Sequence, residues 1–99
     1  MLTSKQRNFL RKQALELPDI IFIGKDGLSD NIIKLANEAL EARELVKGKI
    51  QSNSVEDVKN AAETLANATR SEVIATIGKK FVLFRQKPKE SHYELTDRR

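Results

Sequence analysis

Four consecutive residues, Gly24, Lys25, Asp26 and Gly27, have the types and spacing that suit contact with a phosphate group. Two glycines around a tight turn let the backbone approach a ligand without a Cβ atom in the way. The turn precedes a predicted helix, whose first N–H groups and dipole favour an anion, and Lys25 adds a mobile cation. The spacing matches neither a P-loop nor a dinucleotide-binding fingerprint. The structural alternative is that the glycines only permit positive φ angles, so this pattern alone is a weak indication of binding.

The residue inventory argues against catalysis and metal binding. The chain contains no cysteine and one histidine, which excludes thiolate sites, cysteine nucleophiles and metal sites built from several histidines. Asp26 and Asp30 lie near the glycine turn, but capping and the helix dipole explain acidic residues there. No set of nucleophile, base and orienting residue can be assembled. We therefore expect a protein that is not an enzyme and that uses no cofactor, metal or small-molecule substrate.

The excess positive charge lies toward the two ends of the chain. The 99 residues include 18 Lys and Arg against 14 Asp and Glu, with a formal net charge of +4. Residues 1–25 carry +3 and residues 79–99 carry +4, whereas residues 26–78 carry −3. A fold that joins the ends would form the one-sided basic patch of a polyanion binder; otherwise both ends are simply solvated. The cations that could extend such a patch are Arg7, Arg11, Lys47, Lys79, Lys80 and Arg85.

Several of these cations have structural alternatives. Lys47 and Lys49 share one face of a predicted strand, where their stems can cover apolar surface while the ammonium groups stay hydrated. Lys79 and Lys80 can protect an edge strand from pairing with another chain. Aromatic residues make up 5% of the chain, so the sequence indicates no platform on which nucleobases would stack.

Capping patterns predict three helices. Thr3 with Gln6 three residues later is a capping-box pattern, which predicts a helix over residues 4–16. Ser29 predicts the N-cap of a second helix that runs to about residue 42. Ser54 predicts the start of a third helix.

Apolar patterning and turn residues predict four strands, over residues 20–23, 45–50, 72–77 and 80–85. The first is a continuous β-branched and aromatic run, which is typical of a strand buried on both faces. The element order is then α-β-α-β-α-β-β, an α/β fold with a mixed four-stranded sheet and packed helices. We assign a single domain to residues 1–86 and a polar C-terminal tail to residues 87–99.

Three blocks of residues occur in the order and spacing of a known family: Ile23–Ser29, Glu44–Lys47, and Ile77–Lys79 with Val82–Arg85. Together they resemble the CRM domain (chloroplast RNA splicing and ribosome maturation), and most closely the stand-alone bacterial YhbY-type RNA-binding proteins. The resemblance covers about residues 2–86. It implies an α/β fold similar to the C-terminal domain of translation initiation factor three. It also implies RNA contacts from the loop Gly24, Lys25, Asp26 and Gly27, from Lys47 and from Arg85.

The sequence departs from the family pattern at two positions, Gly48 and Phe84, and the acidic Asp26 also bears on what the loop can bind. Gly48 stands where a β-branched residue is usual, which should weaken that strand locally. Phe84 stands where a tyrosine is common, so a hydroxyl contact there is lost. Asp26 adds a negative charge to the loop, which opposes the approach of a phosphate.

We therefore predict a protein that binds RNA through its glycine loop and adjacent basic residues. Members of the family that it resembles associate with precursors of the large ribosomal subunit, or in plants with group II introns, so ribosomal RNA is the expected partner. A cytoplasmic location is expected, because no apolar run approaches the about 18 residues of a membrane span and residues 1–12 lack a signal-peptide core. A monomer is expected as well. The alternatives are a DNA-binding chromatin-type protein of similar topology and a protein-interaction subunit.

Overall fold

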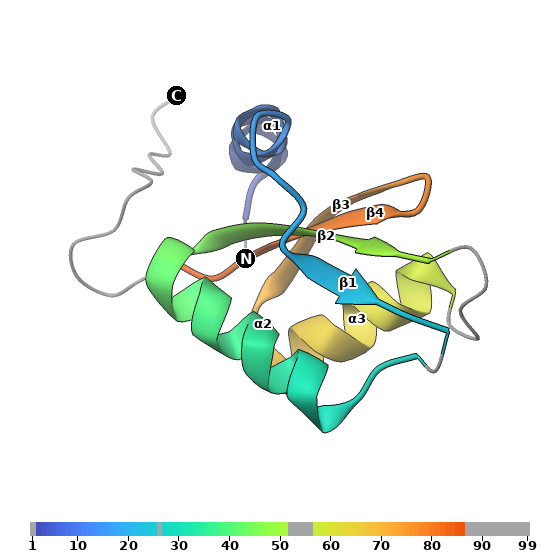
Figure 1. Ribbon diagram of the computed structural model, residues 1–99. Coiled ribbons are helices and arrows are strands. Elements are labelled where there is room, and N and C mark those ends of the chain that lie inside the picture. The colour runs from blue at the N-terminus through green and yellow to red at the C-terminus, as the bar shows by residue number, and fades with distance from the viewer. Residues whose placement is uncertain (1, 26, 52–56, 87–99) are drawn as a thin grey trace.

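The computed structural model describes residues 2–25, 27–51 and 57–86 (Figure 1). Within these ranges it contains the predicted order of elements and the predicted mixed sheet, so the predicted fold class is confirmed. None of the helices in these ranges has the length and apolarity that a membrane span requires. The elements are α1 (Ser4–Ala14), β1 (Ile21–Ile23), α2 (Asp30–Arg43), β2 (Leu45–Ile50), α3 (Val58–Thr69), β3 (Glu72–Ile77) and β4 (Lys80–Phe84).

The sheet has the strand order β1-β2-β4-β3. β1 and β2 are parallel, whereas β4 is antiparallel to both of its neighbours, β2 and β3. The last strand is therefore inserted between two strands that precede it in the chain. α2 and α3 cover one face of the sheet, and α1 lies on the opposite face (Figure 1).

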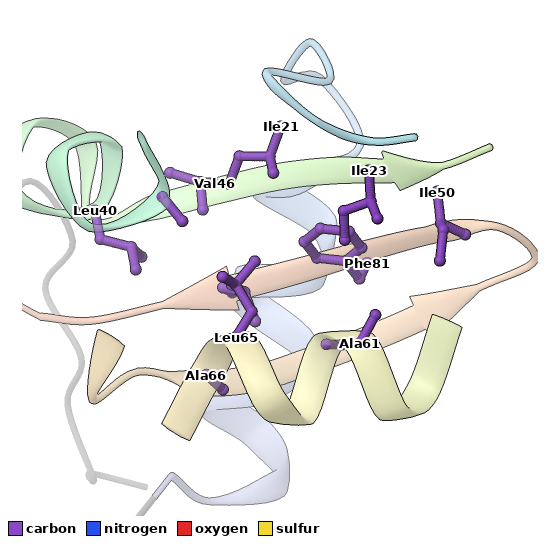
Figure 2. Close-up of a cluster of buried hydrophobic side chains, with 12 residues drawn as sticks. Ile21, Ile23, Leu40, Val46, Ile50, Ala61, Leu65, Ala66 and Phe81 are labelled. Carbon is purple, nitrogen blue, oxygen red and sulfur yellow. The ribbon is translucent and has the colours of Figure 1, made fainter. Parts of the chain in front are cut away.

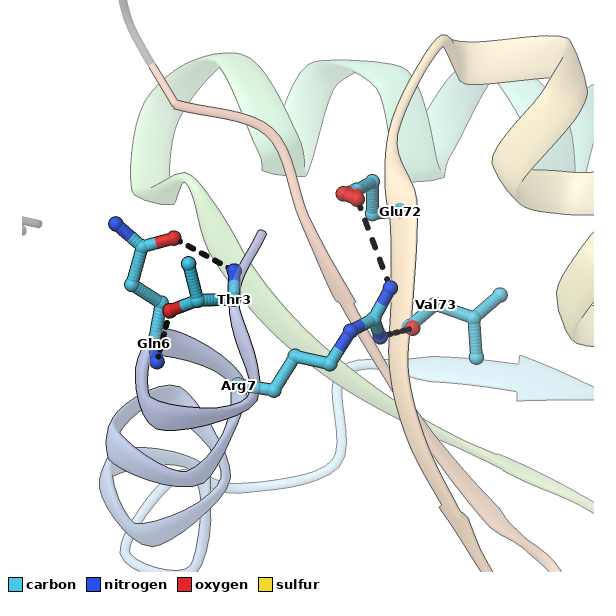
Figure 3. Close-up of polar contacts among 5 residues, drawn as sticks. All are labelled: Thr3, Gln6, Arg7, Glu72 and Val73. Atoms are coloured by element: carbon cyan, nitrogen blue, oxygen red, sulfur yellow. Dashed lines mark hydrogen bonds and ion pairs between the residues drawn. The ribbon is translucent and has the colours of Figure 1, made fainter. Parts of the chain in front are cut away.

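Side-chain caps explain where the helices begin. Gln6 N–H donates to Thr3 Oγ1 at 3.1 Å and Thr3 N–H donates to Gln6 Oε1 at 2.9 Å, which confirms the predicted capping box of α1 (Figure 3). The Ser29 hydroxyl accepts a hydrogen bond from Ile32 N–H at 3.3 Å and caps α2 as predicted. α3 is capped by Asp57 instead. The predicted cap, Ser54, was assigned too early in the chain and lies outside the described residues.

Two apolar clusters hold the layers together. The larger one lies between the sheet and the α2–α3 pair (Figure 2), and the smaller one lies beneath α1. Phe81 and Phe84 point to opposite faces of β4, and both are buried. The buried members of the larger cluster are Ile21, Ile23, Ala36, Leu40, Val46, Ile50, Ala61, Ala62, Leu65, Ala66, Phe81 and Leu83. Those of the smaller cluster are Leu10, Ala14, Leu45, Ile74, Val82 and Phe84.

Packing in the core explains why position 48 is a glycine, and no pattern in the sequence revealed this. Gly48 lies directly opposite Phe81 in the β2–β4 register. A Cβ atom at this position would come within 2.8 Å of Cε1 of Phe81 and 2.9 Å of the carbonyl oxygen of Ile21. The missing side chain therefore makes room for a fully buried ring. Gly48 was expected only to weaken β2 locally, but the packing of Phe81 in the core also requires it.

The strand β1 differs from its prediction in one respect. It was expected to be buried on both faces, but Phe22 is 55% exposed whereas Ile21 and Ile23 are fully buried. The reason is that β1 is an edge strand, and α1 packs mainly on β2 and β3 on that side of the sheet. The outer end of the α1 face is left uncovered.

Candidate nucleic-acid interface

The glycine loop follows β1 directly and lies beside the C-terminal end of β2. Gln51 N–H donates to the carbonyl oxygen of Ile23 at 2.9 Å, which extends the parallel ladder to the base of the loop. Gly27 N–H donates to the carbonyl oxygen of Gly24 at 3.0 Å and closes the turn. Lys25 is exposed. Asp26 lies outside the described residues. The loop thus presents a half-buried glycine and an exposed lysine just before the N-terminus of α2.

The two glycines of the loop have different structural needs. Gly27 has φ of +82°, a conformation that L side chains rarely adopt. Gly24 has no positive φ, and an added Cβ would meet only Oε1 of Gln51, at an ordinary contact distance of 3.8 Å. The fold therefore explains Gly27 but not Gly24. Among the described residues, a side chain at position 24 would meet no steric conflict, so packing does not require glycine there.

The β3–β4 turn lies at the same end of the sheet as the glycine loop. Ile50 N–H donates to the carbonyl oxygen of Lys79 at 2.8 Å, and Ile50 is also the register partner of Ile23. Backbone contacts thus connect Lys79, the end of β2 and the loop at one end of the sheet (Figure 1). The structure gathers Lys79 and Lys25, which are 54 positions apart in the sequence, at one end of the sheet.

A row of four side chains crosses the sheet near this end, on the face that carries α1. Phe22 pairs with Lys49, Lys49 pairs with Lys80, and Lys80 pairs with Ile77. Each strand contributes one member, in the order of the sheet. Two cations therefore lie between two apolar side chains, and all four residues are exposed. We call this set the outer row.

Contacts with α1 and its connection to β1 hold the neighbouring lysines in place. Lys47 Nζ donates to the carbonyl oxygen of Ala14 at 3.2 Å, and Lys80 Nζ lies 3.3 Å from Oδ2 of Asp19. Beside them is a hollow of about 170 Å³. Its lining includes the exposed Arg11, together with Ala14, Leu15, Lys47, Ile77, Lys80 and Val82. The cationic surface thus continues from the outer row onto α1.

Arg7 and Arg85 lie at the other end of the sheet from the glycine loop. Arg7 Nη1 donates to the carbonyl oxygen of Val73 at 2.6 Å, and its Nη2 lies 3.7 Å from Oε1 of Glu72 (Figure 3). Glu72 pairs with Phe84, the residue before Arg85, so both arginines are at the end of the sheet where β3 begins. The length of β2, about 17 Å at 3.3–3.4 Å per residue, separates this end from the loop. The two predicted arginine positions therefore do not join the cations around the loop.

Arg85 ties three elements together. Its Nη1 donates to the carbonyl oxygen of Thr69 at 2.6 Å and to Oδ1 of Asn37 at 2.8 Å, and its Nη2 donates to the carbonyl oxygen of Asn37 at 3.2 Å. Thr69 is the last residue of α3 and Asn37 belongs to α2. The guanidinium group thus links the end of β4 to both helices on the opposite face, which is a structural role.

Sequence reasoning missed two members of this surface. Lys49 was noticed as a neighbour of Lys47 but was not selected as a site residue, although it lies between Phe22 and Lys80 in the outer row. Phe22 was assigned to the core because its neighbours are apolar. The strand order would have been needed to see that β1 is at an edge. Within the described ranges, no group of three His, Cys, Asp or Glu side chains is placed to hold a metal ion.

Comparisons with known proteins agree with this fold. Residues 2–85 match the CRS1 / YhbY (CRM) domain. The Bacillus subtilis protein named "Probable RNA-binding protein YqeI" is 44% identical, over 96% of this chain and 99% of that protein. "Probable RNA-binding protein MJ0652" of Methanocaldococcus jannaschii is 36% identical over 85% of this chain, which spans 63% of that protein.

A solved structure supports the same assignment. The solution structure of SAV1595 from Staphylococcus aureus is 42% identical, covers 97% of this chain and 100% of that chain, and superposes with a TM-score of 0.83. The resemblance inferred from the three sequence blocks is confirmed by these matches. The chain belongs to the CRS1 / YhbY (CRM) domain family.

Proposed function

We propose that this protein binds RNA with the glycine loop and the cations gathered around it. The RNA would be ribosomal RNA in a precursor of the large ribosomal subunit. The protein would act there as a cytoplasmic monomeric assembly factor and not as an enzyme. Two of its relatives carry the name of RNA-binding proteins, and the family resemblance supports the ribosomal role.

One observation carries the proposal: four cations at this end of the molecule have no ion pair or side-chain hydrogen bond in the described part of the structure. They are Lys25, Lys49, Lys79 and Arg11, and all four are exposed. They come from the loop, the end of β2, the turn between β3 and β4, and the outer surface of α1. Cations without internal partners are available to neutralise phosphates. Neutralisation of phosphates is the main source of affinity for nucleic acids.

The loop adds backbone donors to these charges. Gly24 has no side chain to hinder a ligand, and Gly27 turns the chain toward α2, whose N-terminus favours negative charge. Phosphate groups of a folded RNA would lie against the loop, and Lys79 and Lys25 would contact them from the two sides. Such contacts position the RNA without reading base sequence. Discrimination against DNA would then come from the shape of the RNA and from its 2′-hydroxyl groups.

A binding titration with charge-reversal variants tests the proposal. The probes are a structured fragment of large-subunit ribosomal RNA and a DNA duplex of equal length, at matched salt. We expect Lys25→Glu and Lys79→Glu to weaken RNA binding strongly. The matched control is Lys5→Glu, because Lys5 is exposed in the first turn of α1, near Arg7 and away from the loop.

The outcomes separate the proposal from its alternatives. An equal loss of RNA affinity in all three variants would mean that only net charge matters, and it would refute the proposed role of the loop. Displacement of the RNA by duplex DNA at equal concentration would favour a DNA-binding protein. No binding to either probe would favour a protein-interaction subunit. The ribosomal role is tested by sedimentation with precursor and mature large subunits after a salt wash, where retention on precursors only is expected.

A further inference from the structure

The outer row contains apolar surface that the core does not use. Phe22 is 55% exposed and Ile77 is 52% exposed, and both lie on the α1 face at the loop end of the sheet. Leu15, at the end of α1, is 68% exposed and lines the adjoining hollow with Ile77. Leu15 and Ile77 adjoin each other at the hollow, whereas Phe22 lies at the other edge of the sheet, with Lys49 and Lys80 between it and Ile77. Phe22 is therefore an exposed aromatic ring beside cations, and its surroundings decide what it can bind.

The charges around Phe22 favour a polyanion as the occupant. Its nearest cross-strand neighbour is Lys49, one strand spacing or about 4.8 Å away. Lys25 follows three positions later, on the loop that continues from β1. Among the described residues the acidic group known to approach the row is Asp19, which is paired with Lys80. A ring flanked by unpaired cations matches the two parts of a nucleotide, a flat base and a phosphate.

We propose that Phe22 is a stacking site for an unpaired nucleobase of the RNA that the loop binds, an inference that rests on the proposed function. The base would lie on the exposed face of the ring, and Lys49 and Lys25 would contact the phosphates on either side. Base stacking on aromatic side chains tolerates any sequence, because every base has a π-face. The protein would therefore prefer RNA in which a duplex adjoins an unpaired segment.

The row is poorly suited to other occupants. In a symmetric contact of two copies through this face, Lys49 and Lys80 would approach the same residues of the partner, and such like charges repel. An apolar protein segment would have to cover the Lys49 ammonium group without an ion pair, which is costly. An unpaired nucleotide neutralises the cation and covers the ring at the same time.

The first test compares Phe22→Leu with the unchanged protein on two probes. One probe is an RNA hairpin with a short unpaired extension, and the other is the same hairpin with a blunt end. Stacking on one aromatic side chain corresponds to about 5- to 150-fold in affinity. We expect Phe22→Leu to weaken binding of the extended hairpin by about fivefold or more, because leucine is apolar but has no π-face. Binding of the blunt hairpin should not change.

The second test uses the absence of tryptophan from this chain. Phe22→Trp keeps an aromatic ring at the site and introduces a single indole fluorophore. We expect its emission to be quenched when the extended hairpin binds, with the same midpoint as the binding curve. The matched control is Leu35→Trp, since Leu35 is 47% exposed on α2, on the other side of the sheet. Its emission should not respond.

The outcomes distinguish this inference from the proposed function. Failure of the unchanged protein to bind either hairpin would overturn the proposed function. Binding of both hairpins with no effect of Phe22→Leu, or with no quenching of Phe22→Trp, would overturn only the stacking site. Dimerisation that Phe22→Leu abolishes, measured by sedimentation equilibrium without RNA, would assign the row to a second copy and would also overturn the inference.

Discussion

Replacement of Arg85 separates a structural arginine from an RNA-contacting one. The resemblance assigned RNA contact to this residue, but its guanidinium group makes three hydrogen bonds, to Asn37 Oδ1, Asn37 O and Thr69 O, at 2.8, 3.2 and 2.6 Å. We therefore expect Arg85→Ala to lower the stability of the protein and to leave its affinity for RNA almost unchanged. The bonds connect β4 with α2 and with the end of α3, so their loss loosens the whole α2–α3 face.

The size of the effect follows from the exposure of these bonds. A hydrogen bond from a charged group contributes about 1.5–3 kcal/mol, and less where solvent competes for the groups. The bond to Thr69 is partly buried, whereas the two bonds to Asn37 are exposed. We assign about 2 kcal/mol to the set. For a domain of this size, 1 kcal/mol corresponds to about 4–8 °C in Tm, so Arg85→Ala should lower Tm by about 8–16 °C.

The assay combines thermal unfolding, followed by circular dichroism, with an RNA titration at a temperature where the variant is folded. Arg85→Lys should recover less than half of the lost stability, because an ammonium group cannot donate in the fork geometry of a guanidinium. Lys79→Ala is the converse control, with Tm unchanged and RNA affinity reduced. An unchanged Tm together with a clear loss of RNA affinity in Arg85→Ala would refute the structural role and support the RNA contact that the family resemblance implies for Arg85.

Three further predictions concern the glycines and the salt dependence. Gly24→Ala should keep the Tm of the unchanged protein but weaken RNA binding. Equal RNA affinity would show that the loop does not approach the RNA closely. Gly27→Ala should weaken RNA binding and also lower Tm, because Gly27 has a φ of +82°. Gly48→Ala should destabilise by about 1–3 kcal/mol, the usual cost of overpacking, and an unchanged unfolding midpoint in urea would contradict the contact with Phe81. The logarithm of RNA affinity should fall linearly with the logarithm of salt, and Lys25→Ala should reduce that slope by about one phosphate contact; the same slope in both proteins would argue against the contact.

The sequence was a good guide to the fold because its local signals agree with one another. Thr3 and Ser29 satisfy free backbone N–H groups at the helix starts, and this requirement is local in the chain. The alternation in β2 correctly predicted that Lys47 and Lys49 share one face, and the residues between and beyond them, Val46 and Ile50, are buried on the other. Such patterns depend on neighbours within a few residues, and sequence reasoning reads those well.

The features that were missed depend on contacts between distant residues. Phe22 is exposed because β1 is at the edge of the sheet, and the position of β1 is set by pairing with residues 27 positions later in the chain. Gly48 is explained by Phe81, which no local pattern connects to it. Arg85 shows no sign in the sequence of its bonds to Asn37 and Thr69. The RNA-contacting residues themselves remain predictions, because charge in a sequence does not indicate which cations already have partners.

The position of β4 has a consequence for how this protein forms. β4 lies between β2 and β3, which precede it in the chain, and it contributes Phe81 and Leu83 to the main core. Until residues 80–84 have left the ribosome during synthesis, β2 has a partner on one side only and β3 has none in the sheet. The nascent chain therefore cannot complete its domain step by step from the N-terminus. The sheet can be completed only once residues 80–84 are free to pair with β2 and β3.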